Sequence, residues 1–166
     1  MNKTLLVFDM DGTIADLYGC ENWLADLRAF NPRPYVKAKP LHDMKILKET
    51  LIQLKEYGYG VAVTTWLSMD SNSEYDKQVR KAKKEWLDSF DFPYDELHMV
   101  KYGTCKRYVT NPLRGNNTTT PLTQLLIDDN QKVLKDWGKW YKQSIDATNQ
   151  NLLDELTKLL QKEMQK

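Results

Sequence analysis

Short apolar runs separated by amphipathic segments predict alternating strands and helices along this chain. Residues 4–8 are almost continuously apolar, and their number suits a strand that is buried on both faces. Comparable short runs recur later in the chain. They predict further strands at residues 61–63, 96–100, 125–127 and 144–145.

Apolar residues at steps of three and four predict amphipathic helices between these strands. One such series runs from Tyr75 to Phe90, and Ser71 and Glu74 before it have the Ser-x-x-Glu spacing of a capping box. The segment 31–34, which contains two prolines, is expected to end the helix that precedes it. The other predicted helices lie at residues 21–30, 41–54, 133–137 and 152–160.

This alternation predicts an α/β fold, a Rossmann-like three-layer sandwich whose parallel sheet is covered on both faces. Residues 1–166 are expected to form a single domain, because the chain is too short for two ordinary ones. A small helical insertion at about residues 15–40 would follow the first strand. The polar, turn-rich segment 111–121 is interpreted as a long loop, and whether it closes on a ligand stays open.

Composition and charge narrow the function classes. The 24 Lys and Arg residues nearly cancel the 23 Asp and Glu residues, so no overall field draws the protein to nucleic acid or an anionic membrane. Cys20 and Cys105 lack a metal-ligand spacing and are expected to be reduced thiols in a cytoplasmic protein without a leader. The apolar stretch 5–8 is far shorter than the ~20 residues of a membrane span. Oligomeric state is not determined by these features.

Chemically active side chains follow the predicted strands. The carboxyl ends of parallel strands meet at one edge of a sheet, which is where such folds place their working site. The residues after the four main strands are Asp9 and Asp11, Thr64 and Thr65, Lys101 and Lys106, and Asp128 and Asp129. Carboxylates, hydroxyls and an ammonium are the groups that magnesium-assisted phosphoryl transfer needs.

Each residue type has a chemical reason to be there. A phosphate ester repels nucleophiles until a hard cation and a fixed ammonium offset its charge. Asp9 and Asp128 are suitable Mg²⁺ ligands, and the backbone carbonyl of Asp11 is a third candidate. Asp9 is then placed to attack phosphorus, and the Asp11 side chain to donate a proton and later activate water. Gly12 would let the backbone approach the phosphate closely.

Taken singly, these residues also have ordinary structural interpretations. Asp-x-Asp-Gly is a common turn, threonine is frequent in strands and lysine is mostly solvated. Asp9 and Asp11 are harder to explain in this way, because two carboxylates after a buried strand are costly without a cation or partner. The combination of all four segments in this order favours a phosphoryl-transfer site.

These motifs resemble those of the haloacid dehalogenase-like superfamily of phosphatases. The motifs that carry the resemblance are FDMDGT at 8–13, VAVTT at 61–65, YGTCK at 102–106 and LLIDDN at 125–130. The resemblance implies a Mg²⁺ cofactor and an aspartyl-phosphate intermediate. It implies these roles: Asp9 as nucleophile and metal ligand, Asp11 as general acid and base, Thr65 (or Thr64) and Lys106 (or Lys101) as phosphate ligands, and Asp128 as metal ligand supported by Asp129.

Within the superfamily, residues 9–17 resemble the 5′(3′)-deoxyribonucleotidases, although Thr13 stands where that branch has valine. The resemblance implies hydrolysis of nucleoside monophosphates under a helical cap whose aromatic side chains hold the base. In this chain the insertion at 15–40 would be the cap. Its aromatic residues Tyr18 and Trp23, together with Trp66 outside it, have packing of cap on core as an equally good interpretation.

Three functional hypotheses follow. The leading one is a Mg²⁺-dependent phosphomonoester hydrolase whose partner is a small phosphorylated substrate, with nucleotides as one class. A second is a polynucleotide terminal phosphatase, although nucleic acid is not the favoured partner and helix lysines usually form a solvated face. It would need these residues along one path: Lys81, Lys83, Lys84, Lys106, Arg107 and Arg114. The third, of another class, is a non-catalytic module that binds a phosphorylated ligand.

Overall fold

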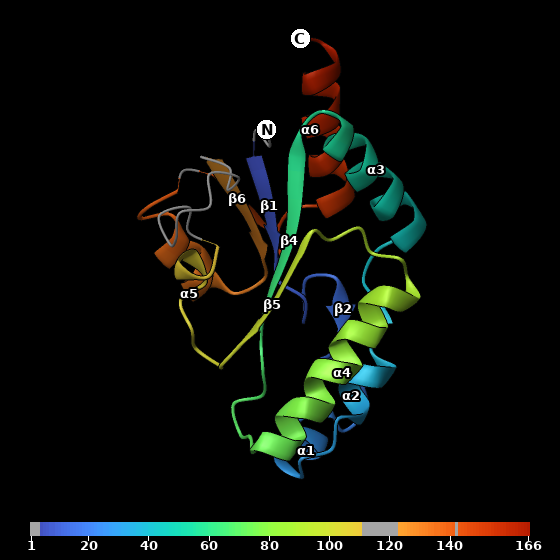
Figure 1. Ribbon diagram of the computed structural model, residues 1–166, viewed down its shortest axis with the longest axis vertical. Helices are drawn as coiled ribbons and strands as arrows, with labels where there is room; N and C mark the ends of the chain where they lie inside the picture. Colours follow the sequence, from blue (N-terminus) through green and yellow to red (C-terminus); the bar gives the residue numbers. More distant parts are fainter. Residues whose placement is uncertain (1–3, 111–122, 142) are drawn as a thin grey trace.

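A five-stranded parallel sheet forms the centre of the computed structural model, which describes residues 4–110, 123–141 and 143–166 (Figure 1). The strand order is β5-β4-β1-β6-β7. The strands are β1 (Thr4–Phe8), β4 (Tyr59–Trp66), β5 (Glu96–Val100), β6 (Thr123–Asp128) and β7 (Gln143–Asp146). All five predicted strands are therefore confirmed, and β1 lies in the middle of the sheet.

Helices cover both faces of the sheet. Leu6 and Phe8 of β1 belong to the core cluster that includes α3 and α6, while Leu5 and Val7 pack in a second cluster with Trp137 of α5. This burial on both sides explains why β1 is continuously apolar. The helices of the sandwich are α3 (Met44–Glu56), α4 (Ser73–Ser89), α5 (Gln131–Trp137) and α6 (Leu152–Met164). The predicted three-layer α/β architecture is confirmed.

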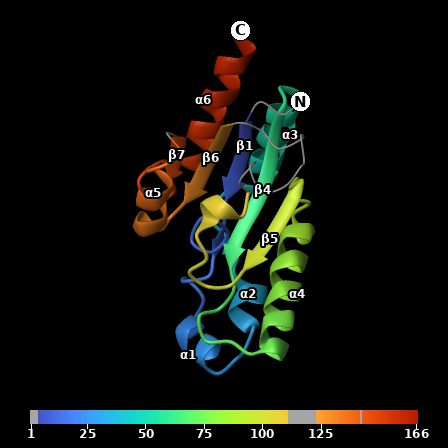
Figure 2. The same cartoon turned by 60° about the vertical axis from the view of Figure 1, so that its left-hand side comes forward.

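The predicted insertion forms a small helical cap beyond the carboxyl ends of the strands (Figure 2). It begins at β2 (Ala15–Asp16) and ends at β3 (Lys39–Pro40), two short strands that pair antiparallel. Between them lie α1 (Trp23–Arg28) and α2 (Arg33–Lys37). The sequence pattern missed α2. The proline segment predicts only the end of a helix, but α1 already ends at Arg28 and the same segment begins α2, where a missing N–H costs nothing.

Helix α4 joins the sandwich to the cap. The indole Nε1 of Trp86 donates a hydrogen bond to the carbonyl of Ala38 at 2.7 Å, and the ring of Tyr75 contacts that of Phe30 with centroids 5.4 Å apart. Both views show α2 beside α4 (Figures 1 and 2). The cap is thus packed against a helix of the core rather than held only by its two connections.

The predicted start of α4 was wrong by one residue. Asn72, not Ser71, is the N-cap, and its side-chain oxygen accepts a hydrogen bond from the backbone N–H of Tyr75 at 2.9 Å. Asparagine and serine are about equally good at this position, so the local pattern does not distinguish two adjacent candidates.

Three other expectations concern loops, thiols and membranes. The predicted loop at 111–121 lies outside the described residues. Cys20 and Cys105 are free thiols, as expected. Within the part of the chain that the structure describes, no helix combines the length and apolarity that a membrane crossing requires.

Candidate active site

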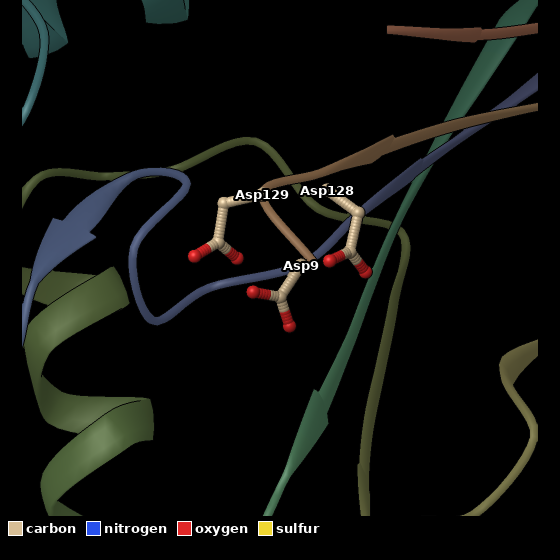
Figure 3. A group of neighbouring side chains, drawn as sticks. All are labelled: Asp9, Asp128 and Asp129. Atoms are coloured by element: carbon tan, nitrogen blue, oxygen red, sulfur yellow. The ribbon is translucent and has the colours of Figure 1, made fainter. Parts of the chain in front are cut away.

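The ends of β1 and β6 bring three carboxylates together. The two strands are paired in register from Thr4 opposite Thr123 to Phe8 opposite Ile127, and the backbone N–H of Asp9 donates to the carbonyl of Ile127 at 2.8 Å. Asp9, Asp128 and Asp129 each offer an oxygen within 4.8 Å of the others, and Figure 3 shows their carboxyl groups gathered at one place. The predicted convergence of Asp9 and Asp128 is confirmed, and Asp129 lies in the same cluster.

Lys106 pairs with two of these carboxylates. It begins the 3₁₀ helix Lys106–Tyr108, its side chain is buried, and its Nζ donates to Asp9 Oδ1 at 2.5 Å and to Asp128 Oδ2 at 2.7 Å. Burial alone would lower the pKa of this ammonium, but Asp9 and Asp128 outweigh burial and raise it. Lys101, the alternative candidate, is exposed.

The loop that carries Lys106 is fastened to β4. Trp66, the last residue of β4, donates its indole N–H to the carbonyl of Thr104 at 2.8 Å. The Lys106 ammonium lies over the Trp66 ring, 5.4 Å from its centroid. The position of Lys106 is therefore set by the neighbouring strand, although Lys106 itself follows β5 in the sequence.

Asp11 has a separate partner, Lys83 of α4. The Lys83 side chain is completely buried, and its Nζ lies 2.5 Å from Asp11 Oδ2, 2.7 Å from Thr65 Oγ1 and 2.8 Å from the Trp66 carbonyl. The expectation that Lys83, like other lysines of this helix, lies on a solvated face was wrong. A signal existed in its spacing, because Lys83 is four residues after Val79 and four before Leu87, both fully buried.

The two threonines at the end of β4 differ in their surroundings. Thr65 Oγ1 accepts the hydrogen bond from Lys83 and so belongs to the site. Thr64, whose side chain points to the opposite face of the strand, has a buried hydroxyl with no hydrogen-bond partner among the described residues. The geometry thus associates Thr65, rather than Thr64, with Asp11.

The turn after β1 requires glycine at position 12. Gly12 has φ +82°, and a Cβ there would collide with the Asp129 carboxylate and lie 2.7 Å from the Tyr18 ring. Its backbone N–H donates to the carbonyl of Ala15 at 2.8 Å. Thr13 follows, with its hydroxyl 3.4 Å from Asp9 Oδ2 and 3.5 Å from Asp129 Oδ1. The turn therefore packs directly against the acidic cluster.

The balance of charge favours a cation in this cluster. With all groups ionised, the four carboxylates (Asp9, Asp11, Asp128 and Asp129) exceed the two ammonium groups (Lys83 and Lys106) by two negative charges. Burial first, and then the charge of Asp9, raise the pKa values of both Asp128 and Asp129. An all-oxygen donor set with a deficit of two charges fits Mg²⁺, which prefers carboxylate oxygens.

The pKa of Asp11 is also raised. Burial is the main cause, Lys83 opposes it and the charge of Asp9 adds to it. A raised pKa favours the protonated form of a carboxyl group, which is the form that can donate a proton.

A cavity of about 350 Å³ opens onto the cluster. Asp9, Asp11, Lys106, Asp128 and Asp129 lie along it, and so do residues of the cap and of the loop after β4. Aromatic side chains form much of the remaining wall. They are Tyr18, Trp23, Tyr35, Trp66 and Tyr102.

The basic residues required for a polynucleotide path do not gather at this cavity. Lys81 and Lys84 are exposed and pair with Glu85 and Asp88 on their own helix. Arg107 stacks on Trp140, with its guanidinium carbon 4.0 Å from the ring centroid. Arg114 lies outside the described residues, and of the five candidates that the structure describes only Lys106 lines the cavity.

Comparisons with known proteins give matches only among solved structures. No family model and no curated protein matches this chain. A chain of the Pnkp1/Rnl/Hen1 complex matches with a TM-score of 0.55 and 17% identity, covering 87% of this chain and 45% of that one. A chain of the Pnkp1/Rnl/Hen1 RNA repair complex matches with a TM-score of 0.54 and 16% identity, covering 87% and 42%. This protein thus spans less than half the length of those two chains.

A third structure, the D,D-heptose 1,7-bisphosphate phosphatase from Burkholderia thailandensis, matches with a TM-score of 0.49 and 14% identity over 82% of this chain and 73% of that one. Identities this low bear on the fold alone. This chain has an α/β fold whose parallel sheet carries an insertion after β1 and an acidic cluster at the strand ends.

Proposed function

We propose that this protein is a Mg²⁺-dependent phosphomonoester hydrolase that works through an aspartyl-phosphate. The observation that carries the proposal is the cluster of Asp9, Asp128 and Asp129, with ligand oxygens within 4.8 Å of one another beside the buried Lys106. These carboxylates, with the backbone carbonyl of Asp11, would hold the ion. When bound, the ion offsets the charge of the cluster and of the phosphate.

The residues of this chain then divide the reaction into two steps. Asp9 attacks phosphorus and forms a P–O bond, while the bond to the leaving oxygen breaks and Asp11 gives that oxygen a proton. In the second step Asp11 removes a proton from water as the water attacks phosphorus, which releases inorganic phosphate and restores Asp9. The raised pKa of Asp11 suits the first of these tasks.

Lys106 and Thr65 would hold the phosphate in this mechanism. Lys106 keeps its positive charge because two carboxylates surround it, so it can offset the charge of the phosphoryl group. Thr65 supplies a hydroxyl at the end of β4. Asp129 adds a third carboxylate to the ion site, beyond the supporting role expected for it, and Gly12 gives the turn room beside it.

Nucleoside monophosphates are the substrate class that we propose first. The aromatic side chains of the cavity come from both cap and core, in two pairs with ring centroids 5.0 Å apart, Tyr18 with Trp23 and Trp66 with Tyr102. Such rings offer apolar faces to a planar base. The resemblance of residues 9–17 to the 5′(3′)-deoxyribonucleotidases supports the same class.

A terminal phosphate of a polynucleotide is the second candidate. The observation in its favour is that both similar chains with the higher TM-scores come from the Pnkp1/Rnl/Hen1 structures, one of them described as an RNA repair complex. The burial of Lys83 removes one of the contacts that this candidate needs.

Hydrolysis of p-nitrophenyl phosphate with and without Mg²⁺ tests the proposed function. We expect activity that EDTA abolishes and Mg²⁺ restores, and a loss of at least about 10⁴-fold in Asp9→Asn. A wild type that is inactive but binds phosphate would instead support a non-catalytic binding module. Rates on mononucleotides and on 5′- or 3′-phosphorylated oligonucleotides then separate the two substrate classes.

A further inference from the structure

Lys83 uses all of its hydrogen-bonding capacity inside the protein. An ammonium group has three N–H donors, and three oxygens lie within hydrogen-bond distance of this one: Asp11 Oδ2, Thr65 Oγ1 and the Trp66 carbonyl. The ring of Tyr35, from the cap, lies 4.9 Å from Nζ. A completely buried lysine is costly unless paired in this way, so its position is tightly specified.

The three oxygens come from two separate segments. Thr65 and Trp66 are the last residues of β4, a central strand of the sheet, while Asp11 lies in the turn after β1. Lys83 therefore connects the turn after β1 to the end of β4. Asp11 lines the cavity, whereas Lys83 does not, so Lys83 lies behind the carboxyl group and not beside a bound ligand.

We propose that Lys83 is a positioning residue for the general acid: it holds one oxygen of Asp11 against the end of β4 so that the other oxygen faces the leaving group. The inference rests on the proposed hydrolase function and adds to it a residue on α4 that no strand-end motif contains. Lys106, in contrast, pairs with Asp9 and Asp128, the carboxylates of the proposed ion site. Correct orientation of a general acid is worth about 10²–10⁴-fold in rate.

The dependence of the rate on the leaving group tests this proposal. A dinitrophenolate departs without a proton, whereas an alkoxide needs one, so only alkyl esters depend on an oriented acid. We expect Lys83→Met to lower kcat/KM for glycerol phosphate at least about 100-fold, and for 2,4-dinitrophenyl phosphate less than about 10-fold. The ratio kcat/KM is the appropriate quantity, because it reports the step that expels the leaving group and not the later hydrolysis of the aspartyl-phosphate.

Matched controls lie on the same helix. Lys81 and Lys84 flank Lys83, with side chains 75% and 58% exposed, so Lys81→Met and Lys84→Met remove a charge without touching Asp11. We expect both variants to keep the wild-type rates on both esters. A general effect of lost charge on α4 would lower them too.

A double variant distinguishes an effect through Asp11 from a folding defect caused by an unpaired buried charge. Lys83→Met alone leaves Asp11 without its partner, whereas Lys83→Met with Asp11→Asn leaves no unpaired charge at that place. If Lys83 acts through Asp11, the double variant and Asp11→Asn alone should hydrolyse glycerol phosphate equally slowly. A double variant at least tenfold slower than Asp11→Asn would overturn the proposal, because Lys83 would then act independently of Asp11.

The outcomes also separate this inference from the proposed function. A wild type that hydrolyses neither ester overturns both. A wild type that hydrolyses both, with Lys83→Met losing the same factor on each, overturns only the role of Lys83.

Discussion

Two buried lysines serve two halves of the same site in different ways. On the β6 side, Lys106 is shared by Asp9 and Asp128, with Asp129 nearby, so three carboxylates face one ammonium. On the β4 side, Lys83 serves one carboxylate, Asp11, and its other two partners are neutral oxygens. With all groups ionised, the first half carries a charge of −2 and the second is neutral.

This difference in charge indicates what each half does in the proposed reaction. A region with surplus negative charge is completed by a cation, while a neutral region needs none. The β6 half therefore fits the binding of metal and the compensation of phosphate charge. The β4 half, whose Thr65 would also contact the phosphate, fits the orientation of a proton donor. Replacement of Lys106 and replacement of Lys83 should therefore change the rates of hydrolysis in different ways.

Among the changes that compare the two halves, the largest expected effect comes from Lys106→Met. We expect hydrolysis to fall about 10²–10³-fold, because the fixed charge that offsets the developing negative charge on the phosphoryl group is lost. The loss should be the same for glycerol phosphate and for 2,4-dinitrophenyl phosphate, unlike that of Lys83→Met. The exposed Lys101→Met is the control and should retain activity. If the loss of activity in Lys106→Met varied with the leaving group, as expected for Lys83→Met, the two lysines would not have the different roles proposed here.

Binding of Mg²⁺ should depend on the carboxylates of the β6 half, because the other half would contribute only the backbone carbonyl of Asp11. A ligand that binds only the folded state at about 100 times its Kd adds about 2.7 kcal/mol to the free energy of unfolding. We expect Mg²⁺ to raise the Tm of the wild type and of Lys83→Met by similar amounts, and that of Asp128→Asn much less. Differential scanning calorimetry measures these shifts. An equal reduction in Lys83→Met and Asp128→Asn would place the ion between the halves instead.

The pH dependence of stability offers a smaller, metal-free test. Burial raises the pKa of Asp128 to about 6 and that of Asp129 to about 7. Because an unfolded aspartate has a pKa of about 3.9, the folded state binds more protons between about pH 4 and 7, and its stability falls as pH rises through that range.

We therefore expect the free energy of unfolding in EDTA, from urea titrations, to be lower at pH 8 than at pH 5. Replacing Asp128 and Asp129 together by asparagine should flatten this slope, and added Mg²⁺ should restore stability most at pH 8. A slope unchanged in the double variant would assign the pH dependence to other groups.

The smallest effect concerns the helix that carries Lys83. Asn72→Ala removes the N-cap of α4 and should cost about 1 kcal/mol of stability. Ser71→Ala, one residue earlier, should change stability by less than about 0.5 kcal/mol. Urea unfolding compares the two variants directly, and the reverse order would mean that Ser71 caps the helix in solution.

The sequence alone predicted the β6 half of the site better than the β4 half. Asp9 and Asp128 follow continuous apolar runs, so their strands and their convergence could be predicted from periodicity and the geometry of parallel sheets. Lys83 follows no strand, so the geometry of parallel sheets does not find it. Its helical spacing indicates a buried position on α4, but no local pattern encodes that the charge it meets is Asp11, 72 residues away in the sequence.

The cap shows the same limit on a smaller scale. Its bounds could be predicted because the apolar strand before it and the amphipathic helix after it are both clear. Helix α2 and the two-residue strands β2 and β3 are too short for a periodic signal, and the prolines near α2 predict only the end of a helix.

The pairing of Ala15 with Pro40 means that the polypeptide leaves and re-enters the core at a single point. One continuous stretch of about two dozen residues could therefore be exchanged for another without disturbing the strand ends that bear the carboxylates. Since Trp86 reaches from the core to Ala38, a transplanted stretch would have to offer a matching surface to that indole. Such an exchange would replace Tyr18, Trp23 and Tyr35 in the cavity wall, while Trp66 and Tyr102 of the core would remain.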